Sequence, residues 1–186
     1  NFNKISNKFR GGSLKNLSIN IEFSLFEELV IQEINGSSNI SNTRFDYNDK
    51  TFKKFLSTIS GDLDFIINPQ KFNDSLINLN LNATNGIVLV NNNFQYKFSK
   101  ATVKGQFYNN DLLISNAEFF KKSDLEYTFH NVRISKNSLD IETATYIKEK
   151  KVHYIFSNTT INNMEITKST FKIKNSKELS KYIKSK

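Results

Sequence analysis

Hydrophobic and polar residues alternate along most of the chain with a period of two. Between residues 17 and 25, Leu, Ile and Phe occupy the odd positions, and Ser, Asn and Glu occupy the even positions. Similar runs cover residues 62–67, 77–83, 94–99, 125–130, 152–157 and 171–174. Successive side chains of a β-strand point to opposite faces, so this pattern indicates strands with one apolar and one polar face. We predict about a dozen short strands.

Asn-rich and Gly-containing segments separate these runs. They include Asn35-Gly36, Asn85-Gly86 and the stretches at residues 91–93, 109–111 and 136–138. Asn and Gly tolerate the positive φ angles that tight hairpin turns require. The short spacing between the turns favours a mostly antiparallel meander, in which each strand pairs with the next one in the sequence.

Helical periodicity is confined to short stretches. Phe52 is followed by apolar residues three, four and seven positions later, which predicts a short helix over about residues 49–59. Ser176 precedes a run that predicts a C-terminal helix over about residues 176–184. Residues 1–9 have the pattern of a helix end that Gly11-Gly12 would stop.

A sheet with one apolar face must hide that face. One or two short helices cover only part of so many strands. The predicted fold is therefore mostly β, a single segment over residues 1–186 that forms an elongated, curved, groove-like antiparallel sheet with an apolar concave face. The alternative is a closed β-sandwich, and the residue pattern leaves both open.

A short pattern occurs twice and favours the elongated sheet. The pattern Leu-x-Ile-x-x-Ala-x-aromatic begins at Leu112 and again at Leu139, a separation of 27 residues. Repeats of this length are typical of stacked hairpins.

Composition limits the classes of function. The chain has no Cys, which excludes disulfides and thiolate catalysis. The net charge of +8 is compatible with an anionic partner such as acidic lipid, and equally with solubility alone. Because the Lys residues are spread along the chain and Arg is nearly absent, we expect no nucleic-acid partner.

Candidate catalytic groups are few. His130 and His153 each lie in an alternating strand, on the side opposite the large aromatic residues, and we interpret both as solvent-facing strand residues. Asp62 and Asp64 lie two positions apart, and a carbohydrate-cleaving enzyme is the weakest hypothesis that they permit. The sequence contains no nucleophile elbow and no phosphate-binding Gly loop. We therefore expect no enzyme, no metal and no cofactor.

Several segments resemble a known family. Phe9-Arg-Gly-Gly12 followed by a strand pattern, the hairpin pattern from Ile34 to Tyr47, Thr58–Leu63, and Val103–Phe107 with Leu112–Ala117 resemble the central region of the AsmA-like superfamily of inter-membrane lipid-bridging proteins. The similarity extends over about residues 5–135. It lies in the pattern of residue types and not in fixed residues.

The resemblance implies a place and a task. AsmA-like proteins of bacteria with two membranes are anchored in the inner membrane by an N-terminal helix, cross the periplasm as a curved β-sheet, and are thought to conduct phospholipid toward the outer membrane. By this resemblance the chain is an excised periplasmic segment whose membrane anchor lies outside it, and its partners are lipid acyl chains. We predict that six apolar strand residues line the groove: Ile19, Ile21, Phe23, Leu79, Leu81 and Phe98.

Two other interpretations remain. Residues 125–174, with Thr143-Ala-Thr-Tyr146, resemble the jelly-roll strands of lipopolysaccharide-transport proteins, which implies the same physical function with another lipid. The closed sandwich would instead suit an adhesin or scaffold domain without lipid cargo.

Overall fold

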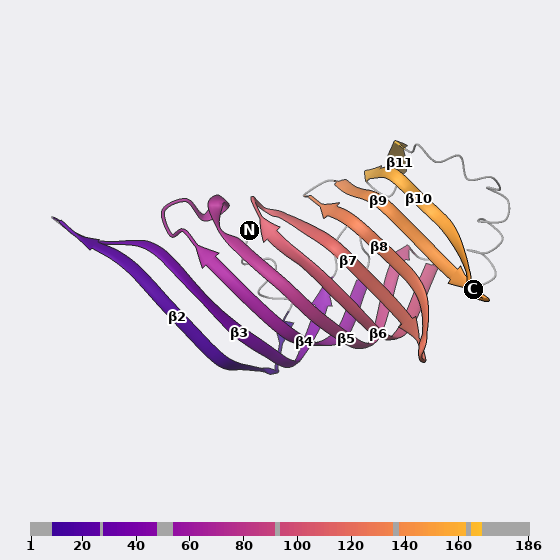
Figure 1. Ribbon diagram of the computed structural model, residues 1–186, viewed down its shortest axis with the longest axis horizontal. Helices are drawn as coiled ribbons and strands as arrows, with labels where there is room; N and C mark the ends of the chain where they lie inside the picture. Colours follow the sequence, from indigo (N-terminus) through magenta and orange to yellow (C-terminus); the bar gives the residue numbers. More distant parts are fainter. Residues whose placement is uncertain are drawn as a thin grey trace.

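The computed structural model describes residues 9–26, 28–47, 54–91, 94–135, 138–162 and 165–168. Almost all of them belong to one antiparallel sheet of eleven strands (Figure 1). The strands are β1 (Phe9–Arg10), β2 (Ser13–Leu25), β3 (Leu29–Tyr47), β4 (Lys54–Ile67), β5 (Leu76–Asn91), β6 (Phe94–Tyr108), β7 (Asp111–Lys121), β8 (Asp124–Ile134), β9 (Ser138–Lys148), β10 (Lys151–Asn162) and β11 (Glu165–Lys168). Among these residues the helical structure is limited to one 3-10 turn, η1 (Phe72–Asp74).

Three of the five predicted turn signals, at residues 91–93, 109–111 and 136–138, fall where one strand ends and the next begins. The predicted turns at Asn35-Gly36 and Asn85-Gly86 were wrong, because these residues lie within β3 and β5. From β3 to β11, each strand pairs with its neighbour in the sequence. β1 and β2 both pair with β3, β1 at Arg44 and Phe45 and β2 along residues 29–41, so the two form one interrupted edge strand. The antiparallel meander is confirmed. The described strands form a single open sheet and not the closed sandwich that was the alternative.

The longer strands bend, which gives the sheet its curvature. β3 to β6 have 14 to 19 residues, and in Figure 1 they turn at the lower edge of the molecule and continue behind the front layer. Irregular backbone lies at this bend: Asn42 has φ 51°, Asn85 has φ 50° and Gly61 has φ 150°. Asn and Gly adopt such angles more readily than other residues. The result is the curved, trough-shaped sheet that the sequence predicts.

The strand register sorts the side chains into two faces. Directly paired residues of neighbouring strands share a face. One row across β4–β9 consists of Phe65, Ile77, Phe107, Leu112, Ile134 and Leu139. A row on the opposite face consists of Asp62, Asn80, Lys104, Asn116, His130 and Thr143. The sheet is therefore apolar on one face and polar on the other.

The best-buried part of the apolar face lies near the bend. Ile59, Ala83, Phe98 and Ala101 form one core cluster, and Ala101 is fully buried. A second cluster lies farther along the sheet and consists of Val132, Leu139, Ile141 and Ala144. Ala83 and Ala101 are direct partners in the sheet, and their small side chains leave room for the large rings beside them.

The repeated pattern corresponds to one hairpin step of the sheet. β8 separates the two copies, and every position of the first copy lies in the same row as its equivalent in the second. The rows are Leu112–Ile134–Leu139, Ile114–Val132–Ile141, Ala117–Phe129–Ala144 and Phe119–Tyr127–Tyr146. The 27-residue period therefore reflects two strands and their turns.

The prediction of a helix over residues 49–59 was wrong for the part that the structure describes. Residues 54–59 belong to β4, where the register shifts between Leu56 and Thr58. This irregularity changes the phase of the strand, so that apolar residues at 55, 56 and 59 imitate helical spacing. Phe9 and Arg10 form β1 and do not end a helix. Residues 1–8, 49–53 and 176–184 lie outside the described part of the chain.

Candidate functional site

The candidate site is the apolar face of the sheet, on the inner side of the bend. Five of the six predicted groove residues lie on β2 and β5, and the sixth, Phe98, lies on β6. Leu79 and Leu81, on β5, are half-buried, and the register places them beside Leu63 and Gly61 of β4. Ile19 on β2 pairs with Gly36, which pairs with Phe65. The apolar row of β4–β9 therefore continues to the edge strand.

Burial along this face changes from one end to the other. Ile19, Ile21 and Phe23 on β2 are 50%, 52% and 55% exposed. Near the bend, by contrast, the sixth predicted residue, Phe98, is only 3% exposed. Its ring packs edge-on against Phe119, with ring centroids 5.2 Å apart. The structure thus assigns Phe98 to the core cluster, while the β2 residues form an open apolar surface.

Exposed apolar residues outside the six predicted groove residues also lie along β2, at the β2–β3 turn and at the start of β3. They comprise Leu14, Leu17, Leu25, Phe26, Leu29, Val30 and Ile31. Val30 is the partner of Ser24 and lies on the polar face. Leu17 and Leu25 belong to the alternating run that identified β2. The others carry no separate signal, because alternation identifies an apolar face but does not show which strands are left uncovered by other structure.

Aromatic rings extend the apolar face across β6 to β10. Tyr96 and Tyr127 meet edge-on at 4.9 Å, and Tyr127 and Tyr146 lie 5.0 Å apart. The Tyr96 hydroxyl donates a hydrogen bond to Glu126 Oε2 at 3.1 Å, so its polar end is satisfied. His153 lies 6.3 Å from the Tyr146 ring and is its direct partner in the sheet.

The two histidines lie on different faces of the sheet. His153 shares a face with Tyr146, its partner on β9. Both histidines are exposed, and His130 lies in the polar row. Within the described residues, no group of three or more His, Asp or Glu side chains is arranged to hold a metal ion.

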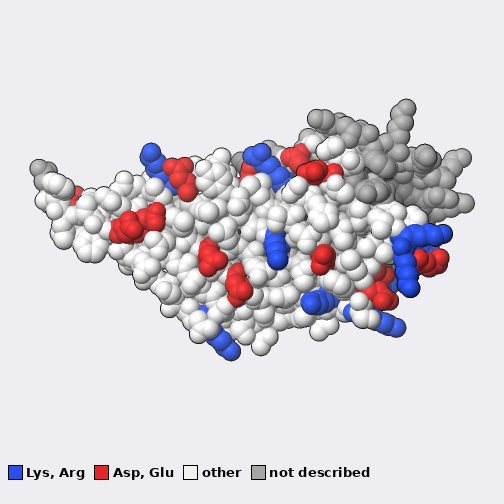
Figure 2. Space-filling view, viewed as in Figure 1, with Lys and Arg blue, Asp and Glu red and all other residues white. Residues whose placement is uncertain are grey.

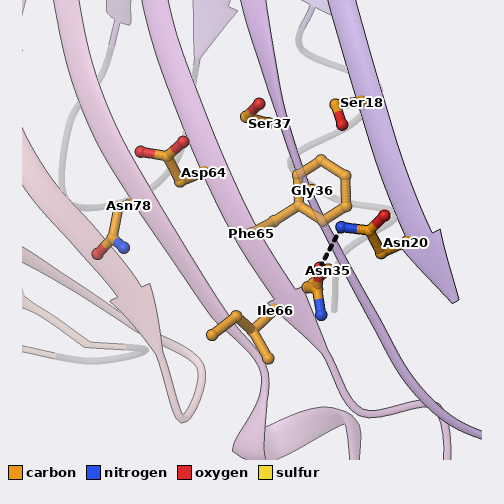
Figure 3. Close-up of a pocket in the computed structure, with 9 residues that line it drawn as sticks. All are labelled: Ser18, Asn20, Asn35, Gly36, Ser37, Asp64, Phe65, Ile66 and Asn78. Carbon is orange, nitrogen blue, oxygen red and sulfur yellow. Dashed lines mark hydrogen bonds between the residues drawn. The ribbon is translucent and has the colours of Figure 1, made fainter. Parts of the chain in front are cut away.

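The polar face carries hydrogen bonds among side-chain amides and carboxylates. Acidic and basic side chains are interspersed over the surface in Figure 2. Asn39 Nδ2 donates to Asp62 Oδ1 at 2.5 Å, and both Asp62 and Asp64 are exposed. A shallow depression of about 360 Å³ lies on β2–β5. Figure 3 shows its lining residues, among which Asn20 donates a hydrogen bond to Asn35 at 3.2 Å. Amides and hydroxyls dominate it, and Asp64 is the single carboxylate of its lining.

None of the helical structure in the described ranges is long and apolar enough to cross a membrane. No protein-family model, no curated protein and no solved structure matches this chain.

Proposed function

We propose that this chain binds the acyl chains of lipid along the apolar face of its sheet, without catalysing a reaction. The observation that carries the proposal is the continuity of that face. Its rows run from half-buried positions on β5 to the exposed residues of β2, and no helix lies over them within the described residues.

The dimensions and chemistry of the face suit an acyl chain. Neighbouring strands lie about 4.8 Å apart, so a row across six strands spans about 24 Å. This exceeds the ~15 Å that one leaflet contributes to the hydrocarbon core of a bilayer. Each buried CH₂ group contributes about 0.8 kcal/mol, and no polar partner is needed. The lack of a metal-binding group among the described side chains is compatible with such a task.

The resemblance to the AsmA-like superfamily supports a wider proposal. In that setting the chain is one segment of a periplasmic protein that conducts phospholipid between the inner and outer membranes. A membrane anchor would belong to another part of the same protein. The curved meander is the fold that this proposal requires.

Site-specific photocrosslinking tests the proposal. A photoreactive phenylalanine analogue at Leu79 should capture lipid in cells, while the same analogue at Asn80 should not, because adjacent strand residues point to opposite faces. Leu79→Asp should reduce the lipid recovered by native mass spectrometry and extraction at least several-fold, and Asn80→Asp should leave it unchanged. Equal crosslinking from both faces, or an unchanged lipid yield from Leu79→Asp, would contradict lipid binding at this face.

A second candidate function is a scaffold or adhesin domain without cargo. The core cluster of Ile59, Ala83, Phe98 and Ala101 favours it, because side chains packed this closely leave no space for a ligand near the bend. The two functions differ in one measurable quantity. A purified, monodisperse protein from which extraction recovers no lipid would support the scaffold.

A further inference from the structure

The edge strand β2 is unusually open to pairing. In the part of the chain that the structure describes, β2 pairs with β3 along one edge and has no partner along the other. Natural edge strands are usually protected by Pro, Lys, inward-pointing charges or bulges. Between Leu17 and Leu25 there is no Pro, and the single charge, Glu22, belongs to the polar face. The register of β2 against β3 shifts near Asn16 and again between Glu22 and Phe23. At the second shift the extra residue, Gln32, belongs to β3, and no residue from Leu17 to Leu25 has a positive φ, so the backbone of β2 itself stays extended over these nine residues.

The sequence of β2 is complementary to itself in one antiparallel register. When Ile21 faces Ile21 of a second copy, Ile19 faces Phe23 and Leu17 faces Leu25, all on the apolar face. On the polar face Asn20 faces Glu22, and Ser18 faces Ser24. No like charges meet. A slip of one residue would place apolar side chains opposite polar ones. A slip of two residues keeps the faces matched but pairs only seven of these nine residues, so the register centred on Ile21 gives the largest number of paired positions.

We propose that two copies of this chain associate through β2, antiparallel and centred on Ile21, to form one continuous sheet. The free backbone groups of β2 would gain interstrand hydrogen bonds, and the exposed Ile19, Ile21 and Phe23 would gain apolar neighbours from the second copy. The two apolar faces would then join into one. This association goes beyond the proposed lipid binding and does not require a cargo.

Cysteine crosslinking tests the register. The natural chain has no cysteine, so one substitution gives one thiol. Directly opposed residues of antiparallel strands have Cα atoms about 4.5–5.5 Å apart, within the range that a disulfide spans. Ile21→Cys should form a disulfide-linked dimer under mild oxidation. Val152→Cys is the matched control, because Val152 is 55% exposed on β10, away from β2. Equal crosslinking of both variants would overturn the proposal.

Charge substitutions test the same pairing without a covalent bond. Asn20→Glu places a carboxylate opposite Glu22 twice in the dimer and should weaken association by roughly tenfold. Asn20→Lys should strengthen it by a similar factor. The double variant Asn20→Glu/Glu22→Lys should restore association, because opposite charges face each other again. Circular dichroism checks that each variant remains folded.

Sedimentation of the unmodified chain over a concentration series gives the dissociation constant for these comparisons. A monomer at every accessible concentration would overturn the proposal. So would a dimer whose dissociation constant is the same for Asn20→Glu and Asn20→Lys. Loss or gain of bound lipid in the Asn20 and Glu22 variants bears on the proposed function separately, because these two residues lie on the polar face and are not among the predicted groove residues.

Discussion

Gly86 lies in a position where the absence of a side chain determines the packing. A Cβ atom at this residue would overlap the ring of Phe98, its direct partner in the sheet. Phe98 cannot easily turn away, because it is buried among Ile59, Ala83 and Ala101. Glycine in a strand commonly marks such a close approach. We predicted a hairpin turn at Asn85-Gly86, because Gly is favoured in turns. Gly86 lies instead within β5, and its preference for turns does not indicate its role in packing.

We expect Gly86→Ala to reduce the free energy of unfolding by about 1–3 kcal/mol, because the added methyl group overpacks the core. Urea unfolding followed by circular dichroism measures the change. The double variant Gly86→Ala/Phe98→Leu provides the control. A smaller ring-free side chain should accommodate the methyl group, so the double variant should lose less stability than the two single changes predict together. Strictly additive losses would show that this overlap is not the cause.

At the scale of the element, sequence alone identified strands well and their irregularities poorly. The alternating runs located β2, β4, β5, β6, β8 and β10, and the repeat at Leu112 and Leu139 anticipated β7 and β9. The helix predicted over residues 49–59 was wrong for the described residues 54–59, where a register shift near Ser57 disturbs the alternation of β4. Such shifts depend on the neighbouring strands of the sheet, and the sequence of a single strand does not show how it will pair with them. Nor does the alternation show that Phe98, one of the predicted groove residues, is buried by its neighbours.

β7 offers a direct test of which face is buried. Leu112, Leu113 and Ile114 are consecutive apolar residues, so their pattern does not identify a face. The register places Ile114 beside Val132 on the apolar face and Leu113 beside Arg133 on the polar face. Ile114→Asp should lower the free energy of unfolding by about 3 kcal/mol or more, since it brings a charge into the apolar cluster.

Leu113→Asp is the matched control, because the same carboxylate would face the Arg133 guanidinium. We expect it to change stability by about 1 kcal/mol or less. Denaturant titration of both variants measures the difference. Similar losses from the two substitutions would be incompatible with the described register.

Across the whole molecule, the apolar side chains of the sheet are unequally shielded from solvent. The apolar side chains of β2 and of the β2–β3 turn are largely exposed, whereas those of β5 and β6 near the bend are buried. Strands with few buried apolar contacts open at lower free energy than core strands. The composition, including the net charge of +8, gave no indication of this gradient, because it arises from how the sheet bends.

Hydrogen exchange should report this gradient. In dilute solution, where self-association is negligible, the amides of β2 should exchange fastest and those around Ala83 and Ala101 slowest. Exchange measured by mass spectrometry on peptides from each strand gives the order. Uniform protection from β2 to β6 would mean that the sheet opens only as a whole and would contradict the expected gradient.

The pairing of β3 to β11 with their sequence neighbours also has a consequence for biosynthesis. As the chain leaves the ribosome, each completed strand finds its partner in the strand made just before it, so the sheet can grow in the order of translation. No segment must wait for a distant one, and loop closure costs little at each step. Because each hairpin pairs only with its neighbours, a gene can lengthen or shorten such a sheet by whole hairpins, and the repeated pattern in β7 and β9 has the length of one such unit.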